Sequence, residues 1–472
     1  MPHRMLMRMM RTSRATPSTW VLAILAASPS AWAAPGDHIG NDDVQLIPAI
    51  ELGAMHRTNV YLQEGEAGGG VPVTDGTALT VAPSLGIRAK NSDLAFTFDF
   101  LYEARKYLQS EVTNLDRFNT IDLGAGLQLF PEGKVGFRVG DRFSITGHEA
   151  EDETGISDSA YQQHLLNDLG AYITVRPGGP LEVDVGGKLQ VDQWNVPEEF
   201  KSSASNRDED LELESGLSGP GLNSRLGYGP ALEGKWRFFP KTAVVADFNY
   251  QWFNWTDNVV DAQGDGISRE EVGDYLAVPD GKMWRARAGL RGRVTPKLVV
   301  GVLAGFGQSL YSEDSVTEQA AELGIEGSGE FADSVGFGSD LKSFPAGLLA
   351  EVEAEYEMID NQAVFLSYRR DFQDVYFTNY VSYDRAMLGY KGLFAERVGV
   401  ELSGTYRYER YLGEVSRDDH LIKADLSGEY MVKDYLAVGI GTGWIRRASA
   451  DQNHPEIEYD DVRFQGGVRF TY

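Results

Sequence analysis

The amino-acid sequence predicts an all-β protein: a closed antiparallel transmembrane β-barrel of about 18 strands, with short periplasmic turns and long extracellular loops. Three observations predict it. Apolar and polar residues alternate along most of the 472-residue chain, as in strands with one apolar face. Short and long connections alternate between these runs. No apolar run approaches the roughly 18 residues that a spanning helix needs. The expected location is therefore the outer membrane of a Gram-negative bacterium.

The beginning of the chain has the order of parts found in a secretory signal peptide. Four arginines precede the apolar run WVLAILAA at residues 20–27, and the small-x-small sequence AWA follows at residues 31–33. A membrane anchor is the alternative, but the run is too short for it. The sequence thus predicts a cleaved signal peptide (1–33), a short periplasmic segment (34–43) and the barrel (44–472).

The strands are predicted from runs in which apolar residues recur at every second position. In LAFTFDFLY, residues 94–102, the even-numbered residues are apolar, and Thr97 and Asp99 occupy the other face. VGVELSGTYRYERY, residues 398–411, repeats the pattern. Eighteen such runs begin near residues 44, 77, 93, 117, 135, 161, 181, 224, 243, 283, 298, 344, 363, 381, 398, 420, 436 and 459.

The connections between these runs favour a barrel over soluble folds. Eight are tight turns of three or four residues, such as PEGK and PGGP, and the other nine are mostly longer and polar. Soluble β-sandwiches or a propeller also alternate, but they seldom sort their turn lengths so consistently. The longest connections, 197–223 and 312–343, are candidates for loops that fold into the lumen.

Two runs predict a charged inner wall. In MWRARAGLRGRV the apolar residues and the arginines fall on opposite faces, and LLAEVEAEYEM does the same with glutamates. We expect Arg291 and Arg293 to lie at the depth of Glu355 and Glu357, over a floor of glycines from the strand between. These opposite charges have two possible roles. They form ion pairs that stabilise the wall, or they create a transverse electric field that orders polar solutes in the lumen. The predicted pore-lining residues are Arg285, Arg287, Arg291, Arg293, Glu351, Glu353, Glu355, Glu357, Arg369, Arg407, Arg463 and Arg469.

The last strand carries a candidate assembly signal. QGGVRFTY places Gln465, Gly467, Phe470 and Tyr472 in the order polar, glycine, apolar and aromatic, which resembles the end of outer-membrane barrels. The expected partner is the machinery that inserts such barrels.

Composition excludes several other functions. The chain has no cysteine, so it forms neither disulfides nor thiolate metal sites. A pI near 4.7 argues against nucleic acid as a partner. No nucleophile elbow or phosphate loop is present, and the scattered histidines do not form a catalytic set with serine and aspartate. We therefore expect no enzyme, no metal and no cofactor.

Some segments point to a family. TNVYLQ at residues 58–63, the run FLSYRRDFQDVYFTNYVSYDRAMLGYKGLF at 365–394, and GTYRYERY at 404–411 resemble the β-barrel porin 2 type of outer-membrane protein. Members of that family often accompany exopolysaccharide export systems. The resemblance implies a path for a secreted polysaccharide, with periplasmic export proteins as partners. A barrel in the outer membrane would also have membrane lipid and lipopolysaccharide around it. The alternative function is a general diffusion porin for small hydrophilic solutes.

Overall fold

The computed structural model describes residues 39–40, 43–60, 74–109, 119–147, 163–195, 225–255, 281–311, 347–375, 378–412, 417–449 and 458–472. The predicted signal peptide and the connections 197–223 and 312–343 lie outside these residues. Within the described ranges, no helix is long and apolar enough to cross a membrane.

All regular structure in the described residues is β-strand, which follows from the two-residue period of the sequence. The strands are β1 (Ile39–Gly40), β2 (Val44–Arg57), β3 (Gly76–Lys90), β4 (Leu94–Tyr107), β5 (Thr120–Leu129), β6 (Val135–Gly147), β7 (Gln163–Gly178), β8 (Leu181–Asn195), β9 (Arg225–Phe239), β10 (Thr242–Trp255), β11 (Gly281–Thr295), β12 (Leu298–Tyr311), β13 (Leu348–Ile359), β14 (Gln362–Val375), β15 (Thr378–Phe394), β16 (Val398–Leu412), β17 (Arg417–Lys433), β18 (Leu436–Ser449) and β19 (Tyr459–Thr471).

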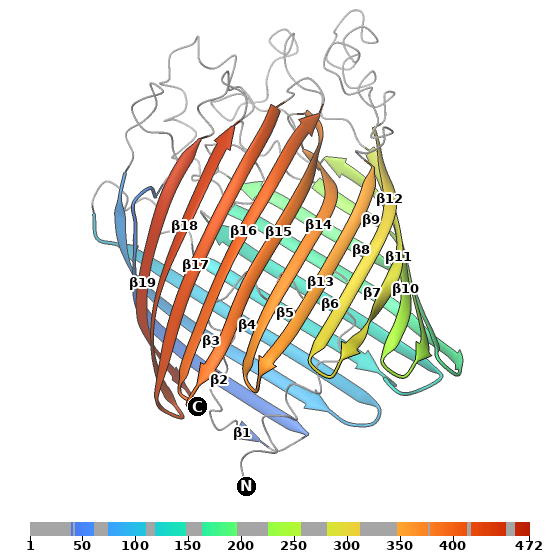
Figure 1. Ribbon diagram of the computed structural model, residues 1–472, viewed down its shortest axis with the longest axis horizontal. Coiled ribbons are helices and arrows are strands. Elements are labelled where there is room, and N and C mark those ends of the chain that lie inside the picture. The colour runs from blue at the N-terminus through green and yellow to red at the C-terminus, as the bar shows by residue number, and fades with distance from the viewer. Residues whose placement is uncertain are drawn as a thin grey trace, which may run out of the picture.

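Strands β2 to β19 form a closed antiparallel barrel of 18 strands, and the predicted fold class is confirmed (Figure 1). Each strand pairs with the next along the chain, and β19 returns to β2 with Gly467 opposite Gly53. Within the described part of the chain, the short strand β1 pairs only with β2, through Ile39 opposite Leu46. Closure leaves no edge with unpaired backbone groups, which is the condition for crossing lipid with strands.

The two ends of the barrel differ. The eight tight turns lie at one end, the turn end, together with the last residue Tyr472 (Figure 1). One of these turns has positive φ at both Ala395 and Glu396, the backbone that tight hairpins prefer. The nine other connections begin and end at the opposite end, which we call the loop end.

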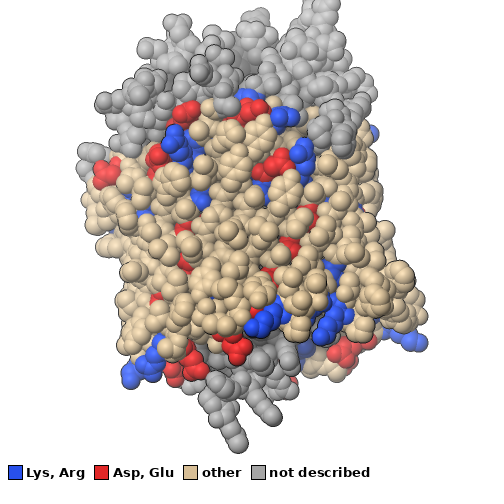
Figure 2. Space-filling model, viewed as in Figure 1, with Lys and Arg blue, Asp and Glu red and all other residues tan. Residues whose placement is uncertain are grey.

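The outward face of the barrel is predominantly apolar. Large side chains such as Val302, Leu366, Leu388 and Ile440 are exposed there, the last by 72% of its surface. Figure 2 shows the face formed by β13 to β19, where uncharged residues dominate the middle and charged side chains gather toward the two ends. This distribution matches an outer surface in contact with acyl chains.

Candidate functional site

The inner wall of the barrel carries the charged faces of the strands. On β11, Leu290 and Val294 point outward with 52% and 68% of their surface exposed, and the alternate positions hold the arginines. Every predicted pore-lining residue occupies an inward-facing strand position, on β11, β13, β14, β16 or β19. Whether these residues line a conducting pore stays a prediction.

The pairing of charges between β11 and β13 differs by two residues from the sequence prediction. Arg291 pairs with Gly301 of β12, which in turn pairs with Glu353. Arg291 Nη2 therefore lies 3.1 Å from Glu353 Oε2, and not beside Glu355 or Glu357. Arg293 does lie level with Glu355, since both are opposite Val299. The prediction was wrong for Arg291 and for Glu357, because β12 and β13 are joined by a long connection and no tight turn fixes their register.

The expected glycine floor is present at this pair. A Cβ built at Gly301 would meet Arg291 Cγ at 3.7 Å and Glu353 Oε2 at 3.8 Å. The arginine and the glutamate therefore meet directly above the glycine, across two strand spacings.

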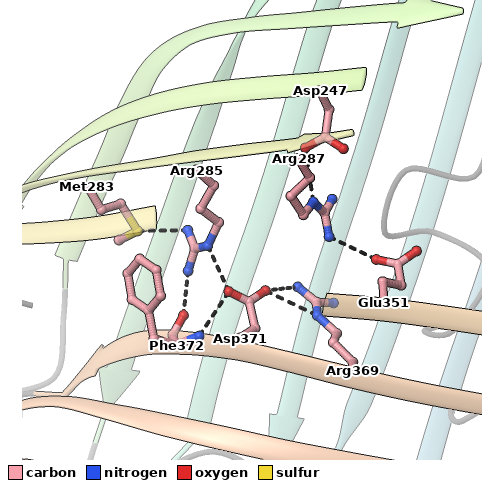
Figure 3. A network of polar contacts seen from close by, with 8 residues as sticks. All are labelled: Asp247, Met283, Arg285, Arg287, Glu351, Arg369, Asp371 and Phe372. Carbon is pink, nitrogen blue, oxygen red and sulfur yellow. Dashed lines mark hydrogen bonds and ion pairs between the residues drawn. The ribbon is translucent and has the colours of Figure 1, made fainter. Parts of the chain in front are cut away.

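Asp371 is the centre of a buried polar network at the inner wall (Figure 3). Its carboxylate accepts hydrogen bonds from Arg285 Nε at 2.9 Å and Arg369 Nη2 at 2.5 Å, and from the Phe372 backbone N–H at 2.9 Å. Arg285 also donates to the Phe372 carbonyl oxygen at 2.5 Å. Since Asp371 is only 3% exposed, these partners are what make its buried charge tolerable.

Arg287 forms a second bridge beside this network (Figure 3). Its Nε donates to Asp247 of β10 at 3.1 Å, and its Nη1 donates to Glu351 of β13 at 2.8 Å. One guanidinium thus joins three strands of the wall, as planar bidentate arginine allows.

The end of β14 turns into the lumen at this point. Pairing with β13 stops at Arg370, whereas pairing with β15 continues to Val375. Phe372 should point outward by the alternation of the strand, yet it is 1% exposed. It packs inside the barrel in an apolar cluster, with residues from four other strands: Phe253, Met283, Leu349 and Tyr380.

A further buried network lies at the loop end on β16, β17 and β18. Arg447 donates to Glu409 and, at 3.1 Å, to Asp419. Arg417 donates to Asp419 at 3.1 Å, and the Tyr411 hydroxyl donates to Glu409 at 3.1 Å. These side chains fill the inner wall where the strands end.

Exposure of the inward charges differs from strand to strand and along each strand. Away from the loop end, the side chains of Glu355 and Asp425 are 56% and 48% exposed, although each has a basic partner within 4 Å. At the loop end, Asp371 and Asp419 are 3% and 0% exposed. Toward the turn end the burial is uneven around the barrel, because the inward side chains of Glu182 and Asp184 on β8 are only 11% and 7% exposed. The inner wall is therefore closely packed around Asp371 and Asp419 at the loop end.

Three arginines form a row across β14, β15 and β16. Arg369 is directly opposite Arg385, and Arg385 is directly opposite Arg407. Arg369 and Arg407 have carboxylate partners, Asp371 and Glu409. Among the described residues Arg385 has no ion pair, and its buried Nε has no hydrogen-bond partner. Sequence reasoning missed Arg385, because Met387 and Gly389 on its own face hide the alternation that would have placed it inward.

The candidate assembly signal has a definite orientation. Phe470 points outward and Tyr472 is exposed at the turn end, whereas Gln465 and Gly467 face inward. Their recognition by assembly machinery stays a prediction. In the described strands, no group of three or more acidic or histidine side chains is arranged to hold a metal ion.

Comparisons with known proteins give structural similarity only. No family model and no curated protein matches the chain. The crystal structure of Acinetobacter baumannii OccAB4 aligns with 11% identity and a TM-score of 0.42, covering 91% of this chain and 98% of that one. The outer membrane protein opdK from Pseudomonas aeruginosa aligns with 8% identity and a TM-score of 0.42, covering 91% of this chain and 99% of that one. The FrpB iron transporter from Neisseria meningitidis aligns with 8% identity and a TM-score of 0.42, covering 90% of this chain and 81% of that one. We transfer no function from similarities this low.

The closed hydrogen-bonded ring and the apolar outer face decide the class of protein. The chain is an outer-membrane β-barrel. Soluble barrels bury their apolar residues inside, whereas here the large apolar side chains are outside and the charged ones inside.

Proposed function

We propose that the barrel is a channel for small hydrophilic solutes and that it favours anionic ones. The observation that carries this proposal is the row Arg369, Arg385 and Arg407, in which the middle arginine has no carboxylate partner among the described residues. Barrels of about 16–18 strands enclose an aqueous lumen unless side chains or loops fill it.

The electrostatics of the row support an anion. Cβ atoms directly opposite on neighbouring strands are about 4.5–5.5 Å apart, and like charges there repel. The guanidiniums of Arg369 and Arg407 are each offset by an acid, whereas no described acid offsets that of Arg385. A carboxylate or phosphate passing through the lumen would relieve this repulsion, and weak transient contacts of this kind suit conduction.

The packed loop end supports a limit on solute size. Asp371 and Phe372 occupy the lumen beside the arginine row, and the Glu409–Arg447 network fills the wall farther round the barrel. A narrow passage fits small solutes better than a wide, hydrated polymer.

Polysaccharide export therefore has weaker support. It rests on the resemblance of the sequence alone, and the packed loop end would have to open for a polymer to pass. Deleting the gene and measuring surface polysaccharide tests this hypothesis separately from the solute proposal: loss of surface polymer would revive it.

The test of the proposal is ion selectivity in planar bilayers. We expect the purified barrel to show a reversal potential that favours chloride over potassium in a salt gradient. Replacing Arg385→Gln should reduce the chloride preference, because it removes the uncompensated charge, and should leave assembly intact.

The matched control is Arg397→Gln, an exposed arginine in a tight turn outside the lumen. It should leave the reversal potential unchanged. A closed or cation-selective wild-type barrel, or equal effects of the two substitutions, would refute the proposal.

A further inference from the structure

A polar patch interrupts the outer surface of the barrel at the loop end of β14 to β19. In Figure 2, charged side chains gather near the upper edge of this face. The outward positions there form what we call the rim patch, which comprises Tyr368, Arg370, Asp384, Tyr406, Tyr408, Arg410, Asp418, His420, Trp444, Arg446 and Asp460. These residues are adjacent across the sheet, with Arg370 opposite Asp384, Asp384 opposite Tyr408, and Tyr408 opposite His420.

The rim patch is ordered by its own contacts. The Tyr408 hydroxyl donates to Asp418 at 2.8 Å, and Arg410 Nη2 donates to that hydroxyl at 2.9 Å. The Arg410 guanidinium also lies 5.6 Å from the centre of the Tyr408 ring. On neighbouring strands, Trp444 Nε1 donates to Asp460 at 2.5 Å, and Arg370 pairs with Asp384 at 3.1 Å. The arginines are therefore partly preorganised, which lowers the entropy lost when a ligand binds.

Two of the arginines remain available to a ligand. Arg410 is about half exposed and its ion pair with Asp418 spans 3.4 Å. Arg446 is exposed and, among the described residues, has neither an ion pair nor a side-chain hydrogen bond. Asp460, directly opposite Arg446, is engaged by Trp444 instead.

The height of the rim patch points to lipid headgroups. Val398 and Arg410 are twelve residues apart on β16. At ~3.3 Å per residue and a strand tilt of ~40°, that separation is roughly 30 Å along the barrel axis. The apolar band of such barrels is about 25 Å tall. Arg410 therefore lies just beyond the acyl chains that contact Val398 and Leu402.

We propose that the rim patch binds the phosphorylated headgroup of an outer-leaflet glycolipid, the lipid A part of lipopolysaccharide. Its phosphates would accept charge-assisted hydrogen bonds from Arg410 and Arg446, and its sugars would lie against the exposed aromatic rings. Its acyl chains would continue onto the apolar side chains of the same strands, such as Leu426 and Ile440. Because the rim patch is outside the barrel, solutes in the lumen do not reach it.

The test is native mass spectrometry of the purified full-length barrel in detergent with added diphosphoryl lipid A. We expect wild-type protein to retain lipid A and to retain chemically dephosphorylated lipid A much less. The double variant Arg410→Gln and Arg446→Gln should lower lipid A occupancy about fivefold, the effect of losing exposed charge contacts.

Lys282→Gln is the matched control, since Lys282 is an exposed outward cation at the loop end of β11, outside the rim patch. It should keep wild-type occupancy, and the heat-dependent shift in gel mobility should show that every variant is folded. The proposal would be overturned if the protein retained both lipids equally, or if the double variant kept wild-type occupancy. It would also be overturned if wild-type protein formed dimers in place of lipid-bound monomers and the double variant abolished those dimers.

Discussion

At the scale of single residues, the environment of a side chain depends on whether it points to the inner wall or to the outer face of the barrel. Neighbours in the sequence such as Glu409 and Arg410 have opposite surroundings. Glu409 is buried in the inner wall against Arg447, and Arg410 is half exposed on the outer face. The effect of adding a side chain at an inner-wall glycine also depends on its position, because a Cβ would meet different atoms at each glycine.

Two glycines on β12 should respond differently to an added methyl group. A Cβ at Gly305 would lie 1.9 Å from the Ala286 carbonyl oxygen, so the backbone of β11 or β12 must shift. A Cβ at Gly301 would only reach ordinary contact with Arg291 and Glu353. We expect Gly305→Ala to reduce the folded fraction in membranes several-fold, and Gly301→Ala to leave it near wild type. Folded barrel is measured by gel mobility with and without heating, and similar yields of both variants would contradict this account.

At the scale of elements, β14 shows where sequence-based prediction succeeds and where it fails. The alternation from Val364 to Arg370 predicted its strand and its inward residues. Nothing in the alternation indicates that the strand leaves β13 after Arg370 and directs Phe372 inward. That departure depends on partners distant in sequence, since Asp371 meets Arg285 of β11, and the Phe372 ring packs over β10, β11 and β13.

Removing the carboxylate of Asp371 should release the end of β14. Asp371→Asn leaves Arg285 and Arg369 without their shared counter-ion, and breaking a buried ion pair in this way costs about 3–5 kcal/mol. We expect a lower unfolding midpoint in urea and a larger single-channel conductance.

The control for this prediction is Asp425→Asn, which removes a half-exposed partner of Arg463 at 3.4 Å. A pair of that kind contributes about 0–1 kcal/mol. If both variants unfold at the same urea concentration with unchanged conductance, Asp371 does not anchor the end of β14.

At the scale of the whole molecule, most of the architecture could be predicted from local pattern. Strand starts such as Val44, Val135, Leu298 and Tyr459 coincide with the predicted runs, because the two-residue alternation that marks a strand is a local property of the sequence. The pairing of Arg291 with Glu353 could not be predicted, because β12 and β13 are joined by a long connection that does not fix their register. The row through Arg385 was missed for a different reason, since Met387 and Gly389 hide the inward face of β15 in the sequence.

The central claim is that one face of each strand borders water and the opposite face borders lipid. The chain has no cysteine, so single cysteines can be introduced without background labelling. In reconstituted vesicles, Arg287→Cys and Arg291→Cys should react with a water-soluble maleimide. Ala288→Cys and Leu290→Cys should resist it, and a fluorophore attached there before reconstitution should be quenched by brominated acyl chains. Equal reactivity at all four positions, or reactivity confined to 288 and 290, would contradict a water-filled barrel with its arginines inside.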